Sequence, residues 1–298
     1  MDNSTAMNGA MTLLDSYEDK IALIIIWTAL VVVGDLGNTL TIYIICRFTV
    51  KSATIIYILS LAIADLTFLT VVVPLTLASI TSNVPTLFED AGRPFVEFLQ
   101  DTTVHVTCWT LMAMTIDRYL AIVYPVKSLN WRTTKTSVLV FTGVWIVSVV
   151  LSMPPALSYN SDLSKATVVG IVLTSFGIPL LVIIACYAKI LVVLHRRNKE
   201  MLQKTEGTPP MKKTRRTAKM VAVLILLFAF SWGPIQVLVM WWTLDPNFTF
   251  SAQLLKFKIF ASTLSYANSC INPFVYAFMN KKIRKAFETK LKVRHGRV

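Results

Sequence analysis

The feature that most constrains the fold of this chain is a series of seven long apolar segments. They lie at residues 21–46, 54–80, 94–124, 136–157, 166–194, 217–243 and 255–279. An apolar helix of about 20 residues crosses roughly 30 Å of hydrocarbon, and each segment is long enough. A soluble domain is about 45–50% apolar, whereas this chain is 55% hydrophobic. We therefore predict an all-α membrane protein, built as a seven-transmembrane helix bundle.

The distribution of charge predicts how the bundle lies in the membrane. With the amino terminus outside, the inner segments carry 24 of the 29 Lys and Arg residues, leaving five for the outer segments. Basic residues concentrate on the cytoplasmic side of membrane proteins, so we predict a multi-pass plasma-membrane protein with its amino terminus outside. Nucleic-acid binding is the alternative explanation of the basic clusters. It is disfavoured because the clusters flank the spans and do not build one folded face.

The sequence contains no pattern typical of a catalytic or metal centre. Each of the four cysteines falls inside a predicted span, where a buried thiol is the ordinary interpretation: Cys46, Cys108, Cys186 and Cys270. The three histidines, His105, His195 and His295, have no zinc-binding spacing. We predict that the protein is not an enzyme and has no cofactor, apart from a regulatory ion considered below.

The chain divides into an outer tail (1–20), the seven-helix domain (21–279) and an inner tail (280–298). Residues 280–291 alternate apolar and basic positions at helical spacing, which predicts an amphipathic helix on the inner membrane surface. The basic inner connection, 195–216, favours contact with anionic membrane lipid, a signalling partner, or both. Asn3 and Asn247 begin N-glycosylation acceptor patterns. The first apolar segment is too long, and follows too many acids, to be a cleaved signal peptide.

Asp117-Arg118-Tyr119 closes the third apolar segment with charge that is costly to place against a membrane. Other motifs occur in chain order at matching depths. They are Gly37-Asn38, Leu61-Ala62-Ile63-Ala64-Asp65, Trp145, Pro179 with Tyr187, Phe228 with Trp232-Gly233-Pro234, and Asn272-Pro273 with Tyr276. Over nearly the whole chain this series resembles the rhodopsin-like (class A) G-protein-coupled receptors.

The resemblance implies an inner switch that couples to a heterotrimeric G protein. Arg118 is expected to be held at rest by Asp117 and to turn toward Tyr187 and Tyr276 on activation. The full set of switch residues is Asp117, Arg118, Tyr119, Tyr187, Asn272, Pro273 and Tyr276. An acid that often restrains this Arg from helix six is missing, since Thr214 and Ala218 occupy that region.

The resemblance also implies an activation toggle formed by Phe228, Trp232, Pro234 and Pro179. In the family this Trp senses the ligand and this Phe repacks on activation. A proline removes a backbone hydrogen bond and bends its helix, so Pro179, Pro234 and Pro273 are expected to act as pivots. The alternative for Trp232 is an ordinary core residue or interfacial anchor.

Asp65 is an ionisable residue in mid-span, which marks a functional site by default. The resemblance implies a sodium site formed by Asp65, Asn38, Thr107, Asn268 and Asn272. The alternative is a polar network that only joins helices. Asp35, one turn before Asn38, is unusual for the family and has no explanation in the sequence.

Two stretches, 230–237 and 265–273, look like the kisspeptin, galanin and allatostatin peptide receptors, and residues near Gln100 and Tyr124 point most toward kisspeptin receptors. This implies an extracellular neuropeptide ligand. An amine receptor would have Asp where Gln100 stands, and a retinal pigment would need a lysine near Tyr266. Helix face and depth give Gln100, Asp101, Gln236 and Tyr266 as pocket candidates. The acidic outer surface would attract a basic peptide, although ordinary solubilising loops would look the same.

Two other functions stay open. In a transporter or channel, Asp65 and Asp35 would line a pathway; in a decoy receptor, ligand would bind without signalling. The chain also departs from the family in its cysteines. Most of these receptors join the outer end of helix three to the second outer loop by a disulfide, but neither the region of Arg93 nor residues 158–165 contain a cysteine.

Overall fold

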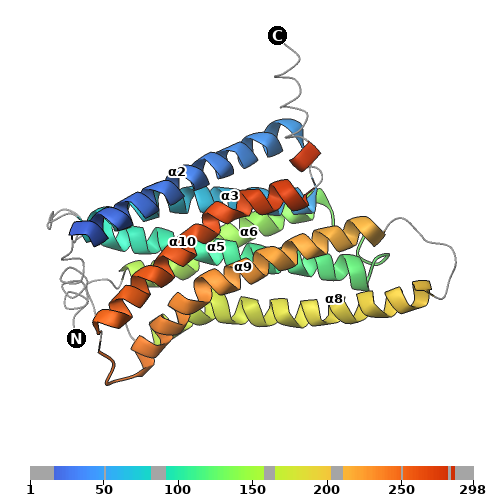
Figure 1. Cartoon of the computed structure of the whole chain (residues 1–298). Coiled ribbons are helices and arrows are strands. Elements are labelled where there is room, and N and C mark those ends of the chain that lie inside the picture. The colour runs from blue at the N-terminus through green and yellow to red at the C-terminus, as the bar shows by residue number, and fades with distance from the viewer. Residues whose placement is uncertain are drawn as a thin grey trace, which may run out of the picture.

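The computed structural model describes residues 17–49, 52–81, 92–157, 165–202, 211–249, 251–280 and 283–285. Within them the chain forms seven helical rods arranged as one bundle, shown from the side in Figure 1. The rods are α2 (Tyr17–Phe48), α3 to α4 (Ala53–Thr67 and Val73–Thr81), α5 (Arg93–Val123), α6 (Thr134–Leu157), α7 to α8 (Lys165–Val172 and Ile178–Leu202), α9 (Met211–Leu244) and α10 (Ala252–Met279). The all-α seven-helix prediction is confirmed. Each predicted span lies within one rod, except that 94–124 extends one residue past the end of α5.

Six of the rods are apolar and long enough to cross a membrane by composition alone. The seventh, α10, is less apolar because it carries a row of polar side chains, including Ser265, Asn268, Ser269 and Asn272. These four are buried in the bundle interior, where polar groups find partners on neighbouring helices. The polar side chains of α10 therefore lie on the face that packs inside the bundle, and they do not weaken its assignment as a span.

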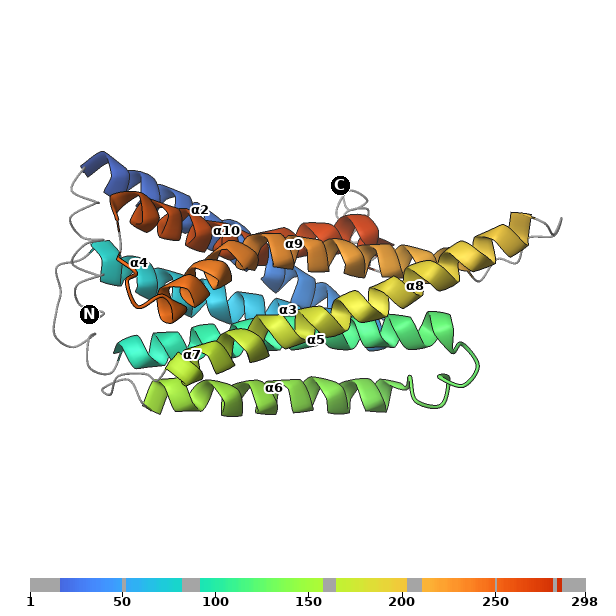
Figure 2. The ribbon, with the colours of Figure 1, turned by 90° about the horizontal axis from the view of Figure 1, so that it is seen from below.

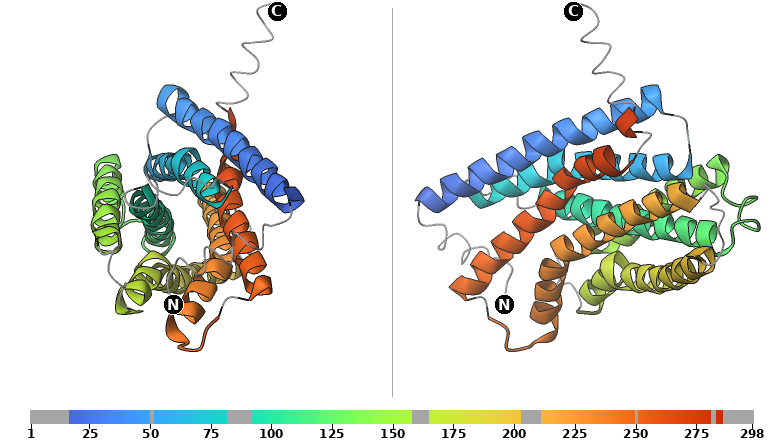
Figure 3. Two further views of the ribbon diagram at one scale, coloured as in Figure 1. Left: turned by 90° about the vertical axis from the view of Figure 1, so that its left-hand side faces the viewer. Right: turned by 45° about the vertical axis from the view of Figure 1, so that its right-hand side comes forward.

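Helix α5 occupies the centre of the bundle. It packs against α3, α6, α8 and α9, while α2 packs against α3 and α10 and thereby closes the ring. Figure 2 shows α6 lying beside α5, and Figure 3 (left) shows the arrangement along the bundle axis. Large apolar side chains also cover the outside, among them Leu36, Leu139, Leu181 and Leu226, each at least two-thirds exposed. An apolar exterior of this kind is suited to lipid.

Two spans are interrupted by a π-helical turn, each joining two α-helices. The turn η1 (Phe68–Val72) joins α3 to α4, and η3 (Leu173–Gly177) joins α7 to α8. A π-turn shifts the hydrogen-bond register and is common at functional sites. In η3 the Thr174 carbonyl accepts a hydrogen bond from the Trp109 indole nitrogen of α5 at 2.9 Å. Packing between helices thus stabilises a register that the local sequence does not show.

The prolines fall where the sequence analysis placed the pivots. Pro234 and Pro273 lie inside α9 and α10, and Pro179 is the second residue of α8, which begins where η3 ends. Figure 3 (right) shows that α9 is bent. Helix α10 ends at Asn280, whose side-chain oxygen accepts from the Ile283 amide at 3.4 Å and begins a new turn. Ile283 is fully buried and Arg284 is exposed; the rest of the predicted amphipathic inner helix lies outside the described residues.

All four cysteines are free thiols, so we expect ligand binding to withstand mild reductant. A disulfide contributes about 2–4 kcal/mol by restricting the unfolded chain, and this chain has no outer pair to lose. Surface binding should be unchanged at dithiothreitol concentrations that abolish binding by a disulfide-containing relative tested in parallel. A large loss of binding in this chain alone would contradict the prediction. The missing disulfide also predicts a wide outer mouth, but the second outer loop, 158–164, lies outside the described residues.

Candidate functional site: an inner charge cluster and a buried polar column

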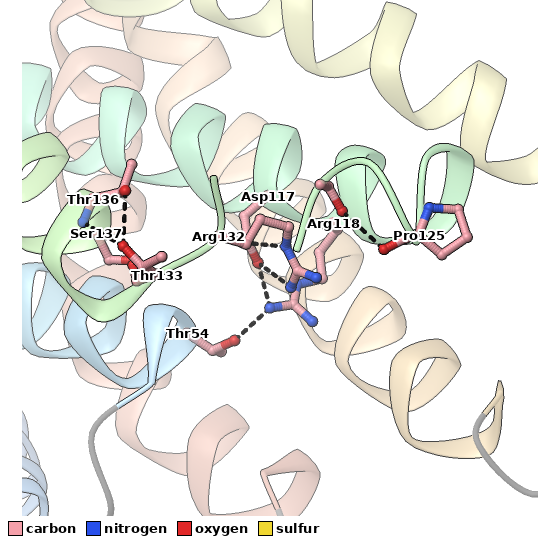
Figure 4. A network of polar contacts seen from close by, with 9 residues as sticks. Thr54, Asp117, Arg118, Pro125, Arg132, Thr133, Thr136 and Ser137 are labelled. Carbon is pink, nitrogen blue, oxygen red and sulfur yellow. Dashed lines mark hydrogen bonds and ion pairs between the residues drawn. The ribbon is translucent and has the colours of Figure 1, made fainter. Parts of the chain in front are cut away.

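Arg118 lies near the carboxyl end of α5, on the side of the bundle that is predicted to face the cell interior and is called inner below. It belongs to a cluster of three charges. Its guanidinium donates hydrogen bonds to the Asp117 carboxylate and, at 2.6 Å, to the Thr54 hydroxyl at the start of α3. Arg132 donates to the other carboxylate oxygen of Asp117 at 2.8 Å (Figure 4). Asp117 and Arg118 are 6% and 8% exposed, and buried charge of this kind is stable only when paired. The cluster therefore joins α3, α5 and the following connection.

Arg132 was not expected from the sequence, and the connection after α5 explains its position. Residues 124–132 fold into consecutive turns, in which the Ser128 amide donates to the Tyr124 carbonyl and the Arg132 amide donates to the Ser128 carbonyl, each at 3.0 Å. Thr133 then caps α6, because its hydroxyl accepts from the Thr136 amide at 3.1 Å (Figure 4). These turns bring Arg132 back to the carboxylate of Asp117, which lies 15 residues earlier in the chain.

Two of the three predicted switch tyrosines, Tyr187 and Tyr276, are the ones that Arg118 is expected to approach on activation. Tyr187 of α8 donates to the Ala218 carbonyl of α9 at 2.9 Å. Tyr276 of α10 is fully buried, and its hydroxyl has no hydrogen-bond partner among the described residues. Arg118 donates hydrogen bonds to Asp117 and Thr54 and, within the described part of the chain, to neither tyrosine. Arg118 is thus paired with Asp117, and the role of this pair as a switch stays a prediction.

A second basic residue ties α9 to α10 on the inner side. Arg216 donates to the Met279 carbonyl at 2.9 Å and to the Phe278 carbonyl at 3.2 Å. Basic side chains commonly satisfy the last carbonyls of a helix, which have no partner within the helix itself. The inner end of α9 is thus held on two sides. Tyr187 of α8 donates to its Ala218 carbonyl, and its own Arg216 donates to the last carbonyls of α10.

Asp65 stands in the middle of a buried polar column between α2, α3, α5 and α10. It is 2% exposed and accepts a hydrogen bond from the Asn272 amide at 2.8 Å. Asn38 is fully buried and donates to the Gly34 carbonyl at 2.9 Å and to the Ser269 carbonyl at 3.0 Å. The structure therefore joins Asp65 to Asn272 directly and brings Asn38 to the same part of α10.

A small cavity lies beside the Asp65 carboxylate. Its lining residues include Asp65, Thr107, Asn268, Ser269 and Trp232, and about 10 Å³ is open to a water-sized sphere. The side-chain oxygens of Asn268 and Asn38 are buried and accept no hydrogen bond within the described residues. Unpaired buried acceptors are costly, and carboxylate, hydroxyl and amide oxygens suit a small hard cation. Ser269 joins this set, although the sequence analysis did not include it.

A continuous series of aromatic rings leads from the outer half of the bundle to this cavity. Phe176 contacts Phe228, and Phe228 contacts Trp232, with ring centroids 5.9 and 6.2 Å apart. Phe68 contacts both Trp232 and Tyr266, at 5.9 and 5.4 Å. Phe228 and Trp232 are 1% and 6% exposed. The predicted toggle pair is therefore packed between a π-turn and the polar column.

The four predicted pocket residues lie in three places. Gln100 and Asp101 are half-buried neighbours on α5. Gln236 lines an apolar groove of about 590 Å³ between η3 and α9, together with Phe176 and Trp241. Tyr266 is buried against Trp27 and Phe68. The described cavities do not bring these four residues together, and their contact with ligand stays a prediction.

Three further helix contacts were not expected in detail. The Trp145 indole donates to the Ser60 hydroxyl at 3.1 Å, and Ser60 is 3.1 Å from the Thr110 hydroxyl, so α6, α3 and α5 meet at one point. His105 lies 3.1 Å from the Thr174 hydroxyl and joins α5 to η3. Trp145 was identified as a family position. Its partner Ser60 could not be predicted from the neighbouring sequence, because the two residues are 85 positions apart.

The predicted glycosylation sites differ in what the structure describes. Asn247 is exposed on the connection after α9, and its amide donates to Asp245 at 2.9 Å. Its exposure is compatible with modification. Asn3 lies outside the described residues.

Comparison with known proteins places this geometry in a family. Residues 37–276 match the model of the 7 transmembrane receptor (rhodopsin family). The chain is 34% identical over 289 residues to "G-protein coupled receptor 54" of Oreochromis niloticus, covering 88% of this chain and 76% of the relative. It is 32% identical to the human "KiSS-1 receptor", covering 88% and 72%, and 30% identical to the human "Galanin receptor type 1", covering 90% and 81%. These relatives are receptors and not enzymes, as the sequence predicts, and the chain belongs to the rhodopsin family of seven-transmembrane receptors.

Proposed function

We propose that this protein is a plasma-membrane receptor for an extracellular peptide and that it activates heterotrimeric G proteins. The observation that carries the proposal is the buried Asp117–Arg118 pair at the inner end of α5, in a chain whose relatives include receptors named for KiSS-1 and galanin. We place the amino terminus outside, on the distribution of Lys and Arg. Anionic inner-leaflet lipid is a further partner of the basic inner segments.

Activation in this proposal is a shift between two helix arrangements, each of which ligand or G protein favours. Ligand in the outer half displaces the aromatic series at Trp232 and Phe228. Helix α9 then moves about Pro234, and its inner end gives up two contacts: the bond from Tyr187 to the Ala218 carbonyl, and the bonds from Arg216 to the carbonyls at the end of α10. Arg118 leaves Asp117 and turns toward Tyr187 and Tyr276, which opens the crevice for the G protein.

The outer contacts with ligand are assigned to Gln100 and Asp101, with Gln236 and Tyr266 contributing from α9 and α10. Glu18, Asp19, Glu97, Asp101 and Asp245 are acids on the described outer part. Their field would raise the encounter rate of a basic peptide. A basic peptide that binds equally fast at low and high salt would argue against this steering.

Sodium is the proposed regulatory ion, held by Asp65, Thr107, Asn268 and Ser269, with Asn272 and Asn38 supporting them. The unpaired Asn268 oxygen beside the carboxylate supports this assignment, because a cation would satisfy both groups. A bound cation would stabilise the resting arrangement. In this chain, Asn272 orients the Asp65 carboxylate, and Trp232 forms the outer wall of the cavity.

Asp65→Asn should remove the sodium dependence of agonist affinity. In the wild-type receptor, raising sodium from low to physiological concentration should weaken agonist binding about fivefold or more, a typical coupling between two sites. The neutral amide cannot balance the cation, so the variant should bind agonist equally at both concentrations. Potassium at matched ionic strength is the control. If sodium still weakens binding to the variant, this assignment of the ion site is wrong.

The proposed function is tested by nucleotide exchange. Receptor in lipid nanodiscs should be mixed with purified G proteins of several subtypes and challenged with KiSS-1-type and galanin-type peptides. Peptide-dependent exchange supports the proposal. Peptide binding without exchange on any subtype would instead support the decoy function, and ion flux in liposomes would support the transporter or channel.

A further inference from the structure

Asp35 is an acidic residue in the middle of the first span and has no role in the mechanism above. The span runs from Glu18 to Phe48, so Asp35 lies two residues from its midpoint, or about 3 Å along the axis at 1.5 Å per residue. Thr70, on η1 in the second span, lies three residues from the midpoint of Ala53–Thr81. Both side chains are thus near the centre of the hydrocarbon.

The two residues meet on the lipid-facing surface of the bundle. The Thr70 hydroxyl donates to one carboxylate oxygen of Asp35 at 3.2 Å, and this contact is exposed. Asp35 is half-buried and Thr70 is exposed. Around them lie lipid-facing apolar side chains, including Val32 and Leu36, which are 52% and 68% exposed. An acid here faces lipid, whereas acids in membrane helices almost always face the bundle interior or a water-filled cavity.

Two other acids within the described spans, both buried, are better satisfied. Asp65 is buried with Asn272, and Asp117 is buried between two arginines. Within the described part of the chain, Asp35 has one neutral hydroxyl as its partner and leaves its second oxygen without one. A carboxylate in hydrocarbon is stabilised most by a cation. The position therefore calls for a basic group from outside this bundle.

We propose that Asp35 and Thr70 form the recognition point for a transmembrane helix of another protein that carries Lys or Arg at mid-membrane depth. Acidic and basic side chains within membranes pair with one another because each is costly alone. The exposed apolar face of α2 around Asp35 gives the partner helix a surface to pack on, and Thr70 holds the carboxylate at that face.

A second copy of this chain does not supply the required cation. The Lys and Arg residues of the described spans lie toward their ends, and Arg118, at the inner end of α5, is also buried and paired with Asp117. Two copies packed through α2 would bring Asp35 against Asp35. Charge complementarity therefore selects a different protein with a basic transmembrane residue.

The test measures pairing with designed helices by energy transfer in phosphatidylcholine vesicles. The full receptor is labelled at Cys46, which is exposed on α2, after Cys186→Ser removes the other partly accessible thiol. The probes are Leu/Ala helices with one central Lys, with Leu in its place, or with the Lys moved to one end. We expect the central-Lys helix to bind about tenfold more tightly than the Leu helix, as for a polar contact between membrane helices.

Variants of the receptor separate the carboxylate from the fold. Asp35→Leu should abolish the preference for the central-Lys helix. Asp35→Asn, which keeps a partner for Thr70 but has no charge, should reduce it strongly. Thr70→Val is the matched control: it removes the same hydrogen bond but keeps the carboxylate, and should keep most of the preference. Thermal unfolding in detergent checks that each variant is folded.

Three outcomes would overturn the proposal. One is equal binding of the Lys and Leu helices to the wild-type receptor. Another is a Lys preference that persists in both Asp35→Leu and Asp35→Asn. The third is energy transfer between two receptor copies that falls in Asp35→Leu while the Lys helix shows no preference, which would make this surface a contact between identical chains.

Discussion

The Arg118→Ala receptor should still bind peptide at the cell surface, but should catalyse guanine-nucleotide exchange at least about tenfold more slowly than the wild type. A change of this size is within the usual range of coupling between two sites. Arg118 is the buried cation at the inner end of α5, and its guanidinium is the group expected to reach Tyr187 and Tyr276 in the active arrangement. Truncation leaves Asp117 paired with Arg132, so the fold should persist. Purified receptor, G protein and a labelled guanine nucleotide give the rate.

A variant of opposite sign makes this result specific. Thr54→Ala removes the hydrogen bond that holds Arg118 toward α3 and keeps the guanidinium, so agonist-free exchange should rise. Tyr276→Ala should lower exchange as Arg118→Ala does. The agonist-free exchange rate of the wild type also tests whether the missing acid on the sixth span, α9, raises basal activity. Unchanged exchange in both Arg118→Ala and Tyr276→Ala would overturn the proposed inner switch.

Gly34→Ala should strongly destabilise the bundle, although alanine is the better helix former. A Cβ atom at position 34 would lie 2.3 Å from Leu69 Cδ1 and 3.0 Å from Cys270 Sγ. Leu69 is fully buried and has no free space to move into. Small residues let membrane helices approach closely, and overpacking costs about 1–3 kcal/mol. Helix α2 would have to move away from η1, which carries Leu69, and from α10, which carries Cys270. The Cys270 thiol also donates to the Leu30 carbonyl of α2 at 3.0 Å.

Gly143→Ala on α6 is the matched control for this change. A Cβ atom there has open space within 4 Å, so the variant should be neutral or more stable by up to about 1 kcal/mol, the usual helix-propensity gain. Thermal unfolding of both variants in the same detergent provides the comparison. Equal melting temperatures would show that α2 can move away from η1 and α10 without cost, and that the close approach at Gly34 is unimportant.

The sequence alone determined the features that depend on local composition. A span of about 20 apolar residues is long enough to cross the membrane whatever it packs against, so the seven spans agree with the rods of the structure. Basic residues beside the spans predict orientation by the same local logic. The motifs around Asp65, Arg118 and Trp232 indicated the family because each lies within a single helix and has the spacing typical of that family.

The tertiary structure decided which side of each helix faces the bundle and which residues meet. Lipid is as apolar as a protein core, so an apolar helix such as α2 carries little information about its own rotation. Asp35 could have faced inward, and only the packing of Gly34 and Asn38 against α10 turned it toward lipid. Arg132 reached Asp117 through the turns of a connection. Ser269 joined the polar column because Asn38, 231 residues away, donates to its carbonyl. Contacts between distant polar groups orient the helices, and such contacts have no local signature in a sequence.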